Sequence, residues 1–225
     1  MSCEYCGKEA VYKCSVCGEP LCASHVEFRT VCARCAKKTR LQFSMSMVET
    51  ESDRQKIREL VERFWGEEEQ LTFDKRFAVA EQPAFVAKTR NKLVGFISFA
   101  ELEDAIVIVA LGILPSYQGS GVGKKLIERV EMEAERKRKT RLLVSTSNDD
   151  LPALAFYQRL GFQIYEVKPG AIAEKHGEVL EGIGGLPVRD ELRLRKFFQE
   201  NSGGAGRGTR TRAAPKGHRL SRPAH

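Results

Sequence analysis

The sequence predicts a mixed α/β domain built on one sheet, with a small cysteine-rich module before it and a disordered tail after it. Three observations support this fold class. All seven cysteines of the 225-residue chain occur within its first 35 residues. Strand-like and helix-like patterns alternate over 41–200. Residues 201–225 are rich in Gly, Arg, Pro and Thr and lack the apolar side chains that would offset the entropy of ordering. We therefore divide the chain into 1–40, 41–200 and 201–225.

The first elements of the middle segment are a strand, a helix and a hairpin. Apolar and polar side chains alternate over 41–48, which predicts a strand. Apolar residues recur at helical spacing over 51–65, which predicts an amphipathic helix. Two strand-like runs at 84–89 and 92–100 are separated by a polar turn and predict a hairpin.

A central strand and its helix come next. Residues 105–114 are nearly all apolar, as expected of a strand buried on both faces. Residues 121–139 have one apolar face and predict a long helix. The apolar run at 141–147 predicts another strand.

The last elements are a helix and two closing strands. Residues 151–160 predict a helix that Gly161 ends. Residues 162–167 and 188–197 predict two strands, the second alternating leucines with charges. The predicted order is β-α-β-β-β-α-β-α-β-β, which is a mixed sheet flanked by helices.

The net charge of +7 resides almost entirely in the last segment, which has no acidic residue. Its six cations are Arg207, Arg210, Arg212, Lys216, Arg219 and Arg222. The rest of the chain is close to neutral, which argues against a body that is basic all over, as in a histone-like protein. No run of about 18 apolar residues occurs, and no apolar stretch typical of a signal peptide occurs at the N-terminus. We expect a cytoplasmic protein with no membrane partner.

The first segment carries eight potential metal ligands in four pairs, each pair separated by two residues. The pairs are Cys3 and Cys6, Cys14 and Cys17, Cys22 and His25, and Cys32 and Cys35. Zinc prefers four tetrahedral sulfur or nitrogen ligands, so eight ligands predict two structural zincs with no open position for catalysis. A reducing compartment disfavours disulfides. A segment this short cannot bury enough core, so bound metal would supply the missing stability.

This spacing, including the Leu21-Cys22-x2-His25 step, resembles the B-box class of cross-brace double-zinc fingers over about residues 1–37. The resemblance implies that the first and third pairs hold one zinc and that the second and fourth pairs hold the other. The final pair of that class often contains histidines, whereas this chain has Cys32 and Cys35. Sequential pairing of the four pairs therefore stays open as an alternative.

A glycine-containing loop lies between the strand at 105–114 and the helix at 121–139. It reads Gln118-Gly119-Ser120-Gly121-Val122-Gly123-Lys124 and follows Pro115. Glycine lets a ligand phosphate approach the backbone, and a turn that leads into a helix presents unpaired N–H groups at the positive end of its dipole. The spacing matches neither the Walker pattern nor the dinucleotide fingerprint.

The Gln-x-x-Gly-x-Gly form of this loop is similar to the pyrophosphate loop of the GNAT superfamily of acyl-CoA-dependent N-acetyltransferases. A second block resembles the GNAT motif in which a strand ends at Asn and a helix carries Phe-Tyr before Gly-Phe; here these are Asn148, Phe156-Tyr157 and Gly161-Phe162. The resemblance covers about residues 45–198. It implies a GNAT-type fold with acetyl-CoA as co-substrate.

The resemblance also implies residue roles. The pyrophosphate is held by the loop, the pantetheine arm pairs with the end of the strand at 105–114, and this pairing requires the sheet to splay from the strand at 141–147. Asn148 contacts the arm. Tyr157 protonates the departing thiolate, a role that suits a side chain that is neutral at pH 7. The cofactor-binding set is Leu111, Gly112, Ile113, Gln118, Gly119, Ser120, Gly121, Val122, Gly123, Lys124 and Asn148.

The general base is not assigned to a single residue. Some relatives place a Glu on the strand before the Asn, where this chain has Leu143. A water chain could serve instead, and the side-chain candidates are Glu81, Glu101, Glu103, His176 and Glu178.

We expect an enzyme that transfers acetyl from acetyl-CoA to a primary amine, with the zinc module docking a macromolecular acceptor or a partner. The alternative is a non-catalytic acyl-CoA-binding regulator whose zinc module and tail bind protein or RNA. Leu143 favours the regulator, whereas the intact loop and Tyr157 favour the enzyme. The tail could contact RNA weakly and without sequence preference through its charge, since it has no aromatic residue for stacking. A terminus without function is the equal alternative.

Overall fold

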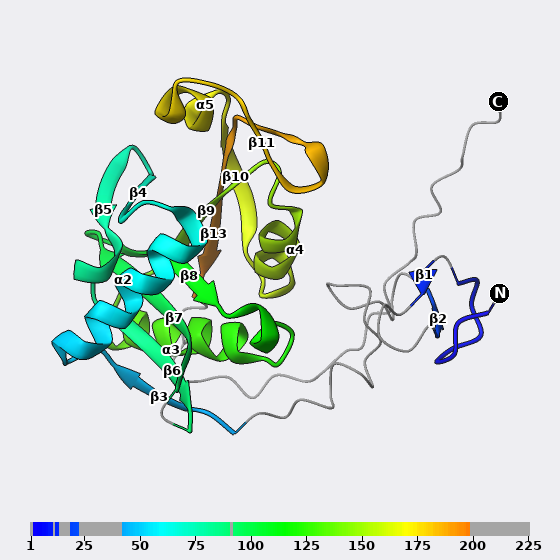
Figure 1. The fold of residues 1–225 in the computed structure, drawn as a ribbon, viewed down its shortest axis with the longest axis horizontal. Coiled ribbons are helices and arrows are strands. Elements are labelled where there is room, and N and C mark those ends of the chain that lie inside the picture. The colour runs from blue at the N-terminus through cyan, green and yellow to red at the C-terminus, as the bar shows by residue number, and fades with distance from the viewer. Residues whose placement is uncertain (1, 11, 14–18, 23–41, 91, 199–225) are drawn as a thin grey trace, which may run out of the picture.

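The structure is a computed structural model of the chain, and it describes residues 2–10, 12–13, 19–22, 42–90 and 92–198 (Figure 1). The predicted disordered tail and most of the predicted zinc module lie outside these residues. The helices and strands of the main domain are β3 (Ser44–Met47), α2 (Glu51–Trp65), β4 (Glu69–Thr72), β5 (Lys75–Ala78), η1 (Val79–Glu81), β6 (Ala84–Thr89), β7 (Lys92–Glu101), β8 (Ala105–Ile113), η2 (Pro115–Tyr117), α3 (Val122–Arg136), β9 (Arg141–Ser147), α4 (Leu151–Arg159), β10 (Gln163–Lys168), α5 (Ala171–His176), β11 (Leu180–Glu181), η3 (Ile183–Gly185), β12 (Pro187–Val188) and β13 (Glu191–Phe197).

A seven-stranded sheet forms the centre of this domain, in the order β10-β13-β9-β8-β7-β6-β3. Neighbouring strands are antiparallel except β8 and β9, which pair in parallel. The sheet is therefore mixed, and the predicted α/β class is confirmed.

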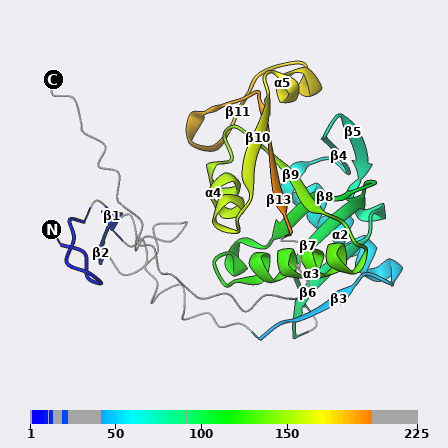
Figure 2. The ribbon, with the colours of Figure 1, turned by 180° about the vertical axis from the view of Figure 1, so that it is seen from behind.

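Helices cover both faces of the sheet. Figure 1 shows α2 in front of the strands, and Figure 2, seen from behind, shows α3 in front of them. On the α3 face, Leu126 and Ile127 pack in one core cluster with Tyr157 of α4. On the α2 face, Ile57 and Val61 pack in a second cluster. Burying these apolar faces is the main favourable contribution to the fold.

The bounds of α2 agree with the prediction because both of its ends carry local signals. The Thr50 side chain accepts a hydrogen bond from the Asp53 N–H, which caps the first turn. Gly66 ends the helix at a φ of 69°, a left-handed conformation that suits glycine.

The last predicted strand is shorter than expected. In place of one strand at 188–197, the structure has β12 and, separately, β13. The intervening Arg189 and Asp190 donate their backbone N–H groups to the side chain of Asn148, so neither N–H is available to a neighbouring strand.

The β4–β5 hairpin and α5 were not predicted from the sequence. The β4 and β5 strands have four residues each, and their turn places Phe73 and Asp74 at φ values of 53° and 60°. Such turns are normally signalled by Asn-Gly or Asp-Gly, which this sequence lacks here. Among the described residues, no helix is long and apolar enough to cross a membrane.

The described part of the N-terminal segment contains a small antiparallel ladder. Strands β1 (Tyr12–Lys13) and β2 (Pro20–Leu21) pair with each other, and Ser2 forms an isolated bridge with Glu9.

Candidate active site

The sheet splays between its two parallel strands. Pairing of β8 with β9 extends from Ala105 and Arg141 only as far as Ile108 and Val144. Beyond that point β8 continues to Ile113 and β9 to Ser147 without pairing to each other. The register of β7 against β8 shifts at the same level, which is a β-bulge that bends β8. This gap is the splay that the pairing of a pantetheine arm with β8 requires.

The glycine loop after β8 presents unpaired amides to open space. Gly119 and Gly121 have φ values of 78° and 88°, and a Cβ added at either would meet nothing within 4 Å. Gly121 is the N-cap of α3 and no side chain caps it. Five backbone N–H groups of this segment donate no hydrogen bond to any described residue. They are those of Gly119, Gly121, Val122, Gly123 and Lys124. Unpaired amides at the positive end of a helix fit an anion such as a phosphate.

Two polar side chains of the loop support its shape. The Gln118 amide donates to the Ile113 carbonyl over 3.0 Å, and the Ser120 hydroxyl donates to the Tyr117 carbonyl over 2.5 Å. The Lys124 side chain is exposed and lies 3.9 Å from the Glu128 carboxylate. Contacts of these three side chains with a cofactor stay predictions, whereas the support that Gln118 and Ser120 give to the loop is visible in the structure.

Tyr157 on α4 is buried, with 6% of its surface exposed. Its ring packs edge-on against Phe156 and Phe162. Burial, and then the negative charge of Asp150, raise the pKa of the Tyr157 hydroxyl well above its ordinary value. Among the described residues this hydroxyl has no hydrogen-bond partner. It therefore keeps its proton at neutral pH and has it available to donate, as a general acid must.

Asn148 follows β9 and is engaged with the chain that precedes β13. Its side-chain carbonyl accepts from the N–H groups of Arg189 and Asp190, both over 2.9 Å. Its amide donates to the Pro187 carbonyl over 2.7 Å. An amide has two hydrogens, so one remains for another acceptor. The expected contact of Asn148 with a cofactor stays a prediction, and no local pattern signals its role in holding residues 187–190.

Two base candidates lie at the wrong end of the sheet. Glu101 pairs in register with Ile106 near the start of β8, and its carboxylate forms ion pairs with Lys137 and Lys139. Val109, the first residue of β8 beyond its pairing with β9, lies three residues after Ile106. Three residues of strand span about 10 Å. Glu103 lies in the turn after Glu101 and is equally far from the splay. The register of the sheet therefore argues against Glu101 and Glu103 as the general base.

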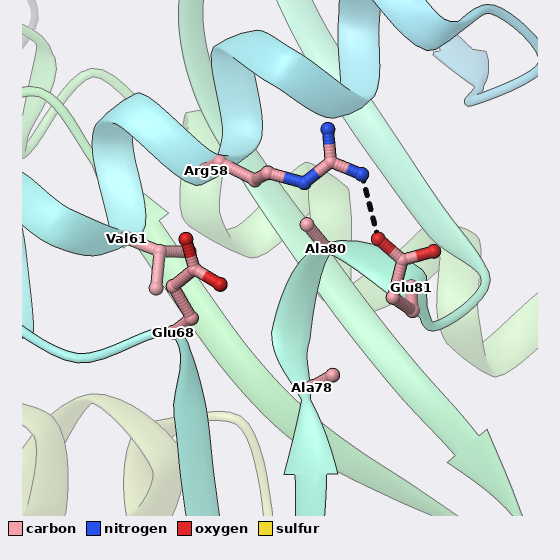
Figure 3. A pocket seen from close by; sticks show the side chains of 6 residues that line it. All are labelled: Arg58, Val61, Glu68, Ala78, Ala80 and Glu81. Carbon is pink, nitrogen blue, oxygen red and sulfur yellow. Dashed lines mark hydrogen bonds and ion pairs between the residues drawn. The ribbon is translucent and has the colours of Figure 1, made fainter.

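Glu81 is engaged by Arg58 and is a poor candidate for the base. It lines a small pocket beside α2 together with Arg58, Val61, Glu68, Ala78 and Ala80 (Figure 3). The Arg58 guanidinium donates to its carboxylate over 2.7 Å and holds the pKa of Glu81 below its usual range. No lining residue comes from β8, β9, α3 or α4. His176 and Glu178 are exposed in the connection between β10 and β13 and stay candidates for the base.

A polar cluster that was not predicted from the sequence lies between the β4–β5 hairpin and the sheet. The Thr72 and Ser145 hydroxyls are 2.6 Å apart. Buried Glu191 accepts from the Phe73 N–H over 3.2 Å. Buried Arg193 binds both Glu191 and Asp74 at 2.9 Å. Since Ser145 is the first residue of β9 beyond the parallel pairing, this cluster fastens the hairpin beside the splay. Its members come from three distant parts of the chain, so no local pattern announces it.

Three of the eight predicted zinc ligands lie together. The sulfur atoms of Cys3, Cys6 and Cys22 are all within 4.8 Å of one another, and those of Cys6 and Cys22 are 3.7 Å apart. Thiolates bound to one tetrahedral zinc at about 2.3 Å are about 3.8 Å apart, so this geometry fits a zinc ion. A backbone hydrogen bond from Glu4 to Pro20 joins the two parts of the cluster.

The other predicted ligands, Cys14, Cys17, His25, Cys32 and Cys35, lie outside the described residues. The proximity of Cys22 to Cys3 and Cys6 agrees with sharing of one ion by the first and third pairs. The zinc content and the full pairing stay predictions.

Comparison with known proteins complements this geometry. A family model described as "Acetyltransferase (GNAT) family" matches residues 50–162. The uncharacterized protein YxbD of Bacillus subtilis (strain 168) is 31% identical over 113 residues, which cover 48% of this chain and 70% of YxbD. The 5-NmdU N-acetyltransferase of Pseudomonas phage PaMx11 is 34% identical over 97 residues, covering 42% and 67%. The crystal structure of a Bacillus subtilis acetyltransferase in complex with CoA superposes with a TM-score of 0.54 at 17% identity, covering 70% of this chain and 99% of that one.

Proposed function

Because the chain belongs to the GNAT family of acetyltransferases, we propose that it transfers the acetyl group of acetyl-CoA to a primary amine. The observation that carries this proposal is the set of unpaired amides at Gly119 and at Gly121 to Lys124, which opens beside the splayed end of β8. Anionic pyrophosphate suits the amides, and the unpaired edge of β8 suits the amide-bearing pantetheine arm.

In this reaction, the chain orients the thioester in the splay and leaves its carbonyl open to attack. The deprotonated amine attacks the carbonyl carbon, the carbon–sulfur bond breaks, and the electron pair stays on sulfur. Tyr157 donates its proton to that thiolate, since its raised pKa keeps the hydroxyl protonated at neutral pH. The proton lost by the amine passes to water or to a base, for which His176 and Glu178 are the remaining candidates.

We assign a macromolecular acceptor, docked by the cysteine-rich segment. The cluster of Cys3, Cys6 and Cys22 supports a metal-stabilised module that supplies no open catalytic position. We further assign Cys3, Cys6, Cys22 and His25 to one structural zinc and Cys14, Cys17, Cys32 and Cys35 to the other. The phage relative is named for transfer to 5-NmdU, so acceptors in this family need not be proteins.

Calorimetry with CoA and thiol release from acetyl-CoA test the proposal. We expect CoA to bind in the calorimeter. When a cell lysate is separated by size into protein, RNA and small-molecule fractions, we expect one of these fractions to accept radiolabelled acetyl. Absence of CoA binding would overturn the proposed function. Binding without transfer to any fraction would support the non-catalytic regulator in its place. Transfer only to small molecules would refute the macromolecular acceptor.

A further inference from the structure

An ion pair joins two segments that are 108 residues apart in the sequence. The Lys175 ammonium on α5 donates to the Glu67 carboxylate in the loop between α2 and β4. Only 11% of the Lys175 side chain is exposed, against 35% for Glu67. Lysine side chains are rarely this covered unless they are paired, so this contact differs from an ordinary solvent-screened surface pair.

Glu67 borders the β8 side of the splay. It follows the end of α2, and Phe64 in the last turn of that helix packs against Gly112 of β8. A Cβ added at Gly112 would meet the Phe64 ring at 2.8 Å. Gly112 lies in the part of β8 that has no β9 partner. The loop that carries Glu67 therefore adjoins the splayed end of β8 on the α2 face of the sheet.

Lys175 borders the β9 side. The N–H of Ile172, in the same short helix, donates to the Arg189 carbonyl over 2.8 Å, and the N–H of Gly170 donates to the Asp190 carboxylate over 2.9 Å. Arg189 and Asp190 are themselves held by Asn148 at the end of β9. In both Figure 1 and Figure 2, α5 lies at the same end of the domain as the β4–β5 hairpin.

The opposite face of the splay is closed by helices. A Cβ added at Gly123 of α3 would meet the Phe156 ring of α4 at 3.3 Å, so the two helices touch there. Tyr157, next to Phe156, packs in the core on that face. Because α3 and α4 cover that face, the α2 face, between the segments that Glu67 and Lys175 join, is the side from which we expect the acceptor to enter.

We propose that the Glu67–Lys175 ion pair is a specificity-determining gate at the acceptor entrance, an inference that rests on the proposed acetyl transfer. While the pair is formed, α5 and the α2–β4 loop are tied together and a small amine enters more readily than a bulky one. A peptide or other macromolecular amine enters after the pair separates. The gate acts on the acceptor and leaves acetyl-CoA binding at the α3 loop unchanged.

The variants Lys175→Met and Glu67→Gln remove the attraction while keeping the length of the side chains. Lys137→Met is the matched control, because it breaks the ion pair with Glu101 at the far end of the sheet. We expect both gate variants to raise kcat/KM for a lysine-containing peptide at least threefold relative to kcat/KM for a small monoamine. The KM for acetyl-CoA should stay constant. A ratio that is unchanged, or that changes equally in Lys137→Met, overturns the gate.

The only tryptophan of the chain supplies a readout that does not need activity. Trp65 lies two residues before Glu67 and is 40% exposed. Opening of the loop should increase quenching of its fluorescence by acrylamide in both gate variants and not in the control. Unchanged quenching overturns the gate even if the enzyme is active. Absence of acetylation of any amine by the wild type refutes the proposed function, while the quenching still decides whether the pair holds the loop.

Discussion

Replacement of Gly121 by alanine tests the anion site at the start of α3. Gly121 has a φ of 88°, a conformation that costs an L-residue about 1–2 kcal/mol. No heavy atom lies within 4 Å of the added Cβ, so strain is the only expected loss of stability. Gly177 is a matched control, since its φ is 74° and a Cβ there also meets nothing within 4 Å. Both alanine variants should therefore fold and lose a similar free energy of unfolding.

The two variants should differ in CoA binding. A methyl group at Gly121 would occupy open space at the N-cap of α3, beside the amides that the phosphate is expected to approach. If the methyl group displaces the phosphate so that it loses one hydrogen bond from an amide, CoA loses about 1.5–3 kcal/mol of binding free energy. Since 1.4 kcal/mol corresponds to a factor of ten, the Kd for CoA should rise about ten- to a hundredfold. Gly177→Ala, at the C-cap of α5, should bind CoA as the wild type does.

Urea denaturation and isothermal calorimetry measure the two effects separately. Pantetheine, which lacks the pyrophosphate, serves as the comparison ligand and should bind both variants equally. If Gly121→Ala binds CoA as tightly as Gly177→Ala at equal stability, then the amides of this loop do not hold the pyrophosphate, and the reasoning fails.

Three further predictions concern the acid, the metal and the hairpin. Tyr157→Phe should lower kcat by a factor of about 10² or more without changing the KM for acetyl-CoA. Because burial raises the pKa of Tyr157, wild-type kcat should show no decline from loss of this proton as the pH rises from 7 to about 10, and a decline abolished by Tyr157→Phe would contradict the assignment. Metal analysis of freshly reduced protein should find about two zincs per chain, and about one in Cys22→Ser; protein without zinc would refute the module. Arg193→Met leaves Glu191, which is 6% exposed, buried without its counter-charge and should lower the free energy of unfolding in urea by about 3–5 kcal/mol. A loss below about 1 kcal/mol would show that the cluster does not fasten the hairpin.

Local signals account for what could be predicted of the fold. The ends of α2 followed from Thr50 and Gly66, which cap the helix through contacts within a few residues. The strand β8 followed from its continuous apolar run, which is buried except near its end. The β4–β5 hairpin could not be predicted, because two short strands joined through Phe73 and Asp74 depend on Arg193, more than a hundred residues later.

Some features of the candidate site could also be predicted from local sequence, whereas others depend on contacts between distant residues. The phosphate loop could be found from its glycines, since the absence of a Cβ is a property of the sequence. The base candidates Glu101 and Glu103 were reasonable in sequence and wrong in space, because strand register places them at the paired end of β8. The second role of Asn148 was hidden, since its partners lie about forty residues further along the chain.

The sequence by itself determined the main strands and helices, the ends of α2 and the glycine loop, because periodicity, capping and the lack of a Cβ operate over a few residues. The tertiary structure decided where β8 and β9 separate and which side chains close the entrance to that gap. Glu67 and Lys175 meet only when the two sides of the splay are folded against the same sheet. Contacts between residues so far apart are set by packing of the whole domain, and no local pattern encodes them.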